Sequence, residues 1–343
     1  MENKVLLLNG ENEIALDQWK FLVENSPVAS FFQTPECYQF YTSLSFLKPF
    51  LYGVAEDGKL KGIACGYVQA EGGKLKQFFS RRAIIPGGIL LDKDIEPDTL
   101  MALLEYLKNE LRKKAIYIEC RNFNDYSEYR PYFEEAGFTY QAHLNVIINT
   151  SDKNSFYQNI SKTKKRQIKK SREAGIIVKE TKERNEIKEF YEILLKLYKQ
   201  EIKKPLFMLE FFEKLVNLPD GHLFIAKFNE QVIGGIACVS FGEKVLYEWF
   251  VGGNKDKYNY LYPSVSVTHA AIEYAIENGY EKFDFMGAGK PNKPYGVREF
   301  KEKFGGETVE YGRFLHVNNK CFYLLGENAI RFLSKFKNNG TRF

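Results

Sequence analysis

Gly62-Ile63-Ala64-Cys65 recurs as Gly235-Ile236-Ala237-Cys238, at an offset of 173 residues, in the second strand of an expected hairpin in each half of the chain. A second identical pair, Glu105-Tyr106 and Glu273-Tyr274, lies in a long helical pattern at an offset of 168. A four-residue identity can arise by chance, but the order of elements around both pairs also agrees over about 150 residues. The chain is therefore predicted to contain an internal duplication.

Hydrophobic periodicity predicts almost the same series of elements in both halves. Each half reads helix, helix, strand, strand, strand, helix, strand, helix, strand, and Asp57-Gly58 is a strong hairpin signal between the first two strands. The first half is expected to hold helices at 14–24, 35–44, 97–113 and 128–136, and strands at 51–56, 60–69, 76–79, 115–120 and 138–149. The second is expected to hold helices at 161–173, 183–199, 209–216, 264–278 and 297–304, and strands at 222–228, 232–241, 244–251, 282–285 and 308–316. This order predicts an α/β protein of two tandem domains with mixed sheets, at 1–150 and 151–320, followed by a C-terminal helix and basic tail at 321–343.

The composition is that of a globular protein. Hydrophobic residues make up 44% and charged residues 27% of 343 residues, which is enough for a sizeable core under a solvated surface. The net charge of +5 does not by itself indicate a nucleic-acid binder. Neither the five cysteines nor the four histidines have metal-ligand spacing, and the odd, scattered cysteines argue against a disulfide framework. We expect no metal and no bound cofactor, and a reducing compartment.

The chain shows no targeting or membrane-spanning pattern. It has neither a signal peptide at its start nor an apolar run of about 18 residues, so a cytoplasmic protein with at most peripheral membrane contact is expected. The stretch 322–337 combines apolar and basic residues and could lie on an anionic membrane surface at the inner face of the membrane. A helix docked on the second domain is the other interpretation.

Seven of the eleven residues from Lys162 to Arg172 are basic, and Ser161 is placed to cap a helix there. Four of them fall on one helical face at i, i+3, i+4 and i+7: Lys162, Lys165, Arg166 and Lys169. Such a stripe can bind phosphates, either a diphosphate or an RNA backbone. A solvated helix face is the alternative, although so dense a stripe repels itself unless an anion meets it.

Three further residues are candidates for chemistry on an ester and an amine. Lys301 lies on a short helix with Val297, Phe300 and Phe304 on one face, where its cation could enter a cleft and polarise a carbonyl oxygen. Asp284 alternates with Phe283 and Phe285 on a strand and could help deprotonate an attacking amine; capping the following loop is an equal alternative. Glu248 is a second base candidate, with an edge-strand charge as its alternative.

Several motifs resemble those of the Fem-type aminoacyltransferases, a family within the GNAT superfamily of acyltransferases. They are Phe31-Phe32-Gln33-Thr34; Arg81-Arg82-Ala83-Ile84-Ile85-Pro86-Gly87-Gly88; the basic stretch from Lys165 to Ser171; and the closing series Gly279 to Gly287, Gly296, Phe300-Lys301 and Phe304-Gly305-Gly306. The resemblance implies two GNAT-like domains, substrate-binding roles for Arg82 and Phe300, and a catalytic role for Lys301.

The resemblance further implies transfer of an aminoacyl group from an ester, as on aminoacyl-tRNA, to the amine of a peptidoglycan precursor, with a lipid-linked precursor as one option. The segment 183–219 is too short for the long coiled-coil arm that some members carry, which counts against a tRNA donor. An acyl-CoA-dependent N-acyltransferase is the nearest alternative. Gly252-Gly253-Asn254-Lys255 lies near the place of a coenzyme A loop but lacks its spacing. A non-catalytic module that binds anionic glycans or nucleic acid is the alternative from another class.

Overall fold

The computed structural model describes residues 4–70 and 80–325, which divide into two compact units. The first unit consists of residues up to Ala142 together with the chain from Tyr311 onward, and the second extends from His143 to Glu310. The predicted strand at 76–79 and most of the predicted C-terminal helix and tail lie outside the described residues. Within the described residues, no helix is long and apolar enough to cross a membrane.

The first unit is built on a mixed sheet with the strand order β1-β2-β3-β4-β6-β15-β7, and β5 pairs with β3. Its strands are β1 (Val5–Asn9), β2 (Lys48–Glu56), β3 (Lys59–Gln69), β4 (Arg82–Gly87), β5 (Leu90–Leu91), β6 (Tyr117–Asn122), β7 (Thr139–Gln141) and β15 (Arg313–Val317). Its helices are α1 (Leu16–Asn25), η1 (Phe31–Gln33), α2 (Pro35–Ser43), α4 (Pro97–Leu111) and α5 (Arg130–Glu135). The predicted hairpin is confirmed: Asp57 and Gly58 both have positive φ angles, as a tight two-residue turn requires.

The second unit contains a sheet with the strand order β14-β8-β13-β12-β11-β10-β9. Its strands are β8 (Leu144–Asn149), β9 (Ile177–Glu180), β10 (Gly221–Phe228), β11 (Gln231–Phe241), β12 (Val245–Gly253), β13 (Lys282–Gly287) and β14 (Glu307–Glu310). Its helices are α6 (Lys153–Asn159), α7 (Lys162–Glu173), α8 (Arg184–Leu197), η2 (Tyr198–Ile202), α9 (Leu209–Leu215), α10 (Lys255–Tyr258), η3 (Asn259–Leu261), α11 (Pro263–Glu277) and α12 (Gly296–Glu302). Both sheets combine antiparallel neighbours with one parallel pair, as predicted for mixed sheets.

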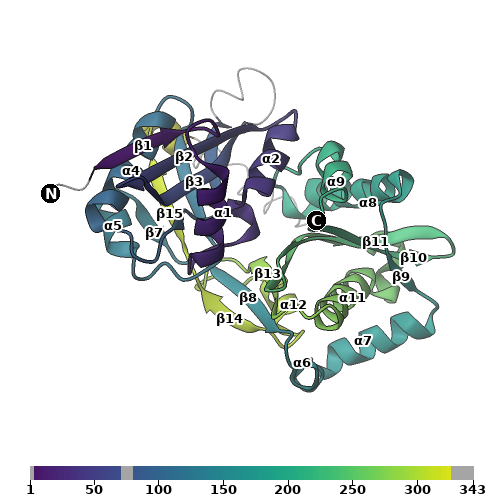
Figure 1. Cartoon of the computed structure of the whole chain (residues 1–343). Coiled ribbons are helices and arrows are strands. Elements are labelled where there is room, and N and C mark those ends of the chain that lie inside the picture. Colours follow the sequence, from purple (N-terminus) through teal and green to yellow (C-terminus); the bar gives the residue numbers. More distant parts are fainter. Residues whose placement is uncertain (1–3, 71–79, 326–343) are drawn as a thin grey trace. The chain divides into compact units, whose positions relative to one another are not determined.

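The two halves of the chain exchange one strand each. β15, from the end of the second half, lies between β6 and β7 in the first sheet, and β8, from the end of the first half, lies between β13 and β14 in the second. Figure 1 shows yellow β15 among the purple and blue strands. The predicted domain boundaries near residues 150 and 320 therefore differ from the division in the structure, at Ala142 and Tyr311.

The exchange has a local cause in each half, because a single predicted strand divides into two. The stretch predicted as 138–149 becomes β7 and β8, and 308–316 becomes β14 and β15. Gly312 marks the second break: its φ is +67°, and a Cβ there would meet the ring of Tyr140 at 2.2 Å. Periodicity predicts strands, but it cannot tell which of two sheets each part joins.

Replacing Phe314 with alanine tests the exchange. Phe314 of β15 is fully buried and stacks on Phe133 of α5, with ring centroids 4.0 Å apart. We expect F314A to cost about 3–5 kcal/mol of unfolding free energy. Hydrogen exchange should accelerate in β4 and β6 rather than in β11 and β12. The matched variant F304A, in the second unit, should give the opposite pattern; faster exchange of the second sheet in F314A would contradict the strand order.

Candidate active site

The parallel strands β12 and β13 separate part-way along their length. Val245, Leu246 and Tyr247 pair with Lys282, Phe283 and Asp284, and the pairing then ends. Irregularities occur on both strands at this point: the register of β12 against β11 shifts at Glu248, and β13 has a bulge between Asp284 and Gly287, with Met286 at φ +56°. The separation leaves backbone groups of β13 without β12 as their ladder partner.

Lys301 of α12 supplies a donor to these backbone groups. Its Nζ donates hydrogen bonds to the carbonyl oxygens of Phe285 and Gly287, and lies 3.4 Å from Oε1 of Glu248. The side chain is only 7% exposed. Lys301 is therefore buried, but the apolar face predicted beside it is partly wrong, because Val297 is 42% exposed. Lys301 thus joins the separated end of β13 to β12.

Glu248 lies on a central strand, so the edge-strand interpretation is wrong. β12 is flanked by β11 and β13, and Glu248 stands in register with Cys238, a member of the second core. One carboxylate oxygen faces Lys301, whereas Oε2 is buried with no hydrogen-bond partner among the described residues. Burial raises the pKa of this carboxyl, and the Lys301 cation opposes that rise only in part. An incompletely satisfied buried carboxylate is able to take a proton.

Asp284 performs the loop-capping role that the sequence offered as an alternative to catalysis. Its Oδ1 accepts a hydrogen bond of 2.5 Å from the backbone N–H of Met286, across the bulge of β13. As predicted, it points away from Phe283 and Phe285, which lie in the core. Burial raises the pKa of Asp284 to about 7. This carboxyl stabilises the bulge, and its burial favours the protonated form.

Phe300 connects this region to the basic helix α7. The Nζ of Lys164 lies 3.5 Å from the centroid of the Phe300 ring and 4.6 Å from that of Phe304. The backbone N–H of Ser161, which caps α7, donates to the carbonyl of Lys303. Sequence reasoning missed Lys164, although it falls on the inward face of α7 with Ile168 and Ser171, at i, i+4 and i+7.

The predicted basic stripe forms an exposed face of α7. Its four members, Lys162, Lys165, Arg166 and Lys169, are all exposed. Among the residues that the structure describes, they form one ion pair, between Lys169 and Glu173 of the same helix, over 3.7 Å. The stripe is therefore open to solvent along its length, whereas Lys164 is buried against the aromatic rings of α12.

Arg82 lies in the first unit, at the start of β4, where it donates to the side chain of Gln69. Arg82 belongs to the Fem-like motif at 81–88. The other Fem-like motif of this unit, at 31–34, holds the end of that motif in place through Gln33. The side-chain amide of Gln33 donates to the carbonyls of Gly87 and Gly88 and to the hydroxyl of Tyr126. In this unit the parallel strands β4 and β6 stay paired over six positions. The separation between strands is therefore a feature of the β12–β13 pair and not of its counterpart.

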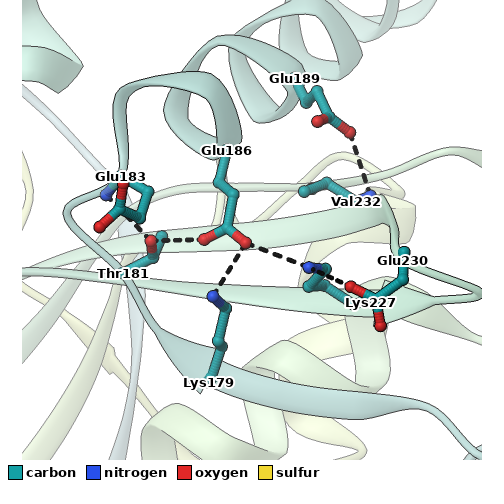
Figure 2. Close-up of polar contacts among 8 residues, drawn as sticks. All are labelled: Lys179, Thr181, Glu183, Glu186, Glu189, Lys227, Glu230 and Val232. Carbon is teal, nitrogen blue, oxygen red and sulfur yellow. Dashed lines mark hydrogen bonds and ion pairs between the residues drawn. The ribbon is translucent and has the colours of Figure 1, made fainter.

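A polar cluster on the second unit fixes α8 to the sheet (Figure 2). Glu186 accepts a hydrogen bond from Thr181 and forms ion pairs with Lys179 of β9 and Lys227 of β10, at 2.8 and 3.3 Å. These partners hold the pKa of Glu186 below its ordinary value, against the effect of burial. All the bonds stay within the protein, so the cluster stabilises the fold.

Comparisons with known proteins place this site in a family context. Residues 158–302 match the sequence model of the acetyltransferase (GNAT) domain. Two Staphylococcus epidermidis proteins are similar over shorter stretches: aminoacyltransferase FemB, 30% identical over 113 residues, and aminoacyltransferase FemA, 31% identical over 94 residues. The chain is also similar to the crystal structure of FemX, with a TM-score of 0.68 and 14% identity over 94% of this chain and 99% of that one.

The chain has a tandem GNAT fold, and its resemblance to the Fem aminoacyltransferases is confirmed. A tandem GNAT protein from the clavulanic acid biosynthesis pathway has the same fold, with a TM-score of 0.62 at 9% identity over 92% of this chain and 99% of that one. The matched residues 158–302 include Glu248, Asp284 and Lys301, so these three candidates lie within the region that resembles the acetyltransferase (GNAT) domain. The FemB and FemA stretches cover 31% and 26% of this chain, and only about a quarter of those proteins' length.

The pH dependence of stability tests the environment of Lys164 in the GNAT domain. Burial and the nearby Lys303 lower the pKa of Lys164 to about 7. Because the unfolded chain then binds a proton that the folded chain does not, the free energy of unfolding should rise between about pH 7 and 10, by up to about 1.4 kcal/mol per pH unit. Chemical denaturation of K164M should lack this rise. K162M, which changes an exposed lysine of the same helix, should retain it; equal slopes in the two variants would refute the assignment.

A double-mutant cycle tests the buried ion pair of the GNAT domain. K301M should cost about 3–5 kcal/mol of unfolding free energy, because it leaves Glu248 and two backbone carbonyls without their cation. K301M/E248Q should recover part of this loss, since the unpaired charge is then absent. Additive losses in urea titrations would show that the two side chains do not interact.

Proposed function

We propose that the protein transfers an aminoacyl group from an activated ester to an amine, with aminoacyl-tRNA as donor and a peptidoglycan precursor as acceptor. The observation that carries this proposal is the buried Glu248–Lys301 pair at the point where β12 and β13 separate. The similarity to FemA and FemB, whose names describe them as aminoacyltransferases, supports the choice of reaction. In such a transfer a C–N bond forms, the ester C–O bond breaks, and the amine loses a proton.

Glu248 and Lys301 would act through one shift of charge. In the resting pair the carboxylate balances the ammonium. When Glu248 takes the proton of the attacking amine it becomes neutral, and the positive charge of Lys301 then faces the oxyanion that develops on the ester carbonyl. The leaving oxygen would afterwards receive the proton from Glu248. The low exposure of both side chains strengthens these electrostatic effects.

Two features support a phosphate-bearing donor. The exposed stripe on α7 offers phosphate contacts along one helix face, and Lys164 and Ser161 attach that helix to α12, which carries Phe300 and Lys301. Phe300 would contact the substrate beside Lys301. No resident cofactor enters this scheme, and contact with a membrane surface would serve only to reach a lipid-linked acceptor.

The loop where a coenzyme A diphosphate would lie gives little support to the acyl-CoA alternative. The residues after β12 form α10 and η3, and the adjacent pocket, of about 260 Å³, is lined by acidic side chains including Glu189 and Glu192. Two lysines of this pocket are already paired: Lys196 with Asp256, and Lys255 with Glu201. A diphosphate would meet an acidic environment there.

Incubation with labelled donors tests the choice of substrate. We expect the protein to transfer label from a radiolabelled aminoacyl-tRNA to a peptidoglycan precursor amine, and to leave acetyl-CoA intact. Transfer from acetyl-CoA alone would establish the alternative reaction. A non-catalytic module would consume neither donor, although it would still bind tRNA through α7, and K301A would then change nothing measurable.

The pH profile of the reaction tests the base. E248Q should lower kcat by about 10²–10³-fold with little change in KM, because it removes the proton acceptor. In the unmodified protein the acidic limb of kcat/KM should lie above the ordinary carboxyl range of about pH 4, since burial raises the pKa of Glu248. D284N is the matched control: its amide oxygen can still accept from Met286, so kcat should stay within about tenfold. Loss of the acidic limb in D284N alone would assign the base to Asp284.

A further inference from the structure

Strand β12 has a bulge immediately after Glu248. Its pairing with β11 passes from Phe250 directly to Glu248 and leaves out Trp249, which is the extra residue. On a regular strand Glu248 and Phe250 would point to the same face. Here Glu248 pairs with Lys301 of α12, whereas Phe250 packs against two aromatic rings of α9. The bulge therefore turns the carboxylate and the ring toward different helices.

The end of α8 lies close to this part of β12. A Cβ on Gly252 would meet the side chain of Leu194 at 2.8 Å, so a glycine is needed for the helix to come so near. The helix then continues into η2, where the N–H of Lys203 donates to the carbonyl of Tyr198 over 2.7 Å. The Tyr198 ring packs on Phe250, with ring centroids 6.2 Å apart. Tyr198 thus approaches β12 from the side of α8 and α9.

Tyr198 is also close to the chain that follows β13. Burial raises the pKa of its hydroxyl to about 12, and Tyr295 and Glu248 add to this rise. The ring of Tyr295, just before α12, packs over Gly289, where a Cβ would meet it at 2.8 Å. A paired strand would separate groups from the two faces of the sheet, but β13 has left β12 at this point. The hydroxyl of Tyr198 is therefore within electrostatic reach of both sides of the opening.

Two polar atoms at this opening lack hydrogen-bond partners. Within the part of the chain that the structure describes, neither the Tyr198 hydroxyl nor Oε2 of Glu248 forms a hydrogen bond. Glu248 is 4% exposed, and Tyr198 is half-buried. A buried polar atom without a partner is costly, and a bound group that supplies the missing hydrogen bond removes this cost.

We propose that the Tyr198 hydroxyl and Oε2 of Glu248 together hold the attacking amine of the acceptor. This inference rests on the proposed function. A neutral primary amine has two N–H groups and one lone pair. One N–H donates to Glu248 and the other to the hydroxyl oxygen of Tyr198, so that the lone pair is left for the ester carbonyl beside Lys301.

Tyr198 orients the amine and keeps its own proton. In the transfer step the amine nitrogen forms the C–N bond, its proton passes to Glu248, the ester C–O bond breaks, and the leaving oxygen receives that proton. A hydroxyl with a pKa of about 12 stays protonated at neutral pH, so Tyr198 does not compete with Glu248 for the proton. A second acceptor fixes the direction of the lone pair, which one carboxylate oxygen leaves free to rotate.

Titration with Nα-acetyl-lysinamide, followed by NMR, tests amine binding without any transfer. Y198F removes only the hydroxyl and keeps the ring on Phe250, so it should weaken binding by about three- to tenfold. The Nε-acetylated compound has no amine, and the intact protein should bind it at least about tenfold more weakly. Equal affinity for the two compounds, or equal affinity of the intact protein and Y198F for the amine, would overturn the proposal.

Y191F is the matched control, because it makes the same change earlier in the chain, in α8. The ring of Tyr191 packs on Phe212, with centroids 5.7 Å apart. Y191F should bind the amine as the intact protein does. Equal losses of affinity in Y191F and Y198F would show that the effect arises from disturbance of the helix, and would also overturn the proposal.

Transfer assays separate the failure of this proposal from the failure of the proposed function. Where the intact protein transfers an aminoacyl group, Y198F should lower kcat/KM by about 10–100-fold, mainly through kcat, because the amine is no longer oriented. Amine binding that is weakened in Y198F, together with no transfer by the intact protein, would retain the amine site and reject the proposed function. Transfer with equal kcat/KM in both proteins would retain the function and reject the role of Tyr198.

Discussion

A single ammonium group satisfies the backbone where two parallel strands separate. Without Lys301, the carbonyls of Phe285 and Gly287 would be buried without the ladder partners that β12 supplies further back, and each such loss costs about 1–3 kcal/mol. The same group balances Glu248. The opening between β12 and β13 is therefore a stable part of the fold, because its polar groups are satisfied by a side chain.

The two sheets use a similar topology in two different ways. In the first sheet β4 and β6 remain paired, and Gln33 fills the turn at Gly87-Gly88 with its amide. In the second sheet the corresponding pair opens, and a lysine and a glutamate occupy the opening. Exchange of β8 and β15 makes each sheet depend on a strand from the other half of the sequence. Neither half of the sequence contains a whole domain.

Much of the fold could be predicted from local patterns. The Asp57-Gly58 turn, the helix predicted at 97–113 and the cap of α7 at Ser161 each depend on a few neighbouring residues, and each is confirmed. The strand exchange could not be predicted, because β8 and β15 have the pattern of ordinary apolar strands. Which sheet each of them joins depends on packing against residues that are far away in the sequence. Arg121 and Arg313 are 192 positions apart, so their spacing in the sequence does not predict that both bind the carboxylate of Glu119.

The candidate site shows the same division between local and distant causes. Sequence patterns identify Lys301, Asp284 and Glu248 as candidates. How these side chains contact one another depends on where α12 packs against β13, which their spacing in the sequence does not predict.

Lys164 is not predicted as a buried residue, because it belongs to a run of basic residues that is typical of a solvent-exposed helix face. In the structure its helix face is decided by contact with Phe300 and Phe304, and its aliphatic stem replaces an apolar residue at that position. A buried lysine packed against two aromatic rings keeps α7 attached to α12, while the other lysines of the helix stay available to an anion. The basic helix therefore serves packing on one side and recognition on the other, and composition alone cannot separate these two roles.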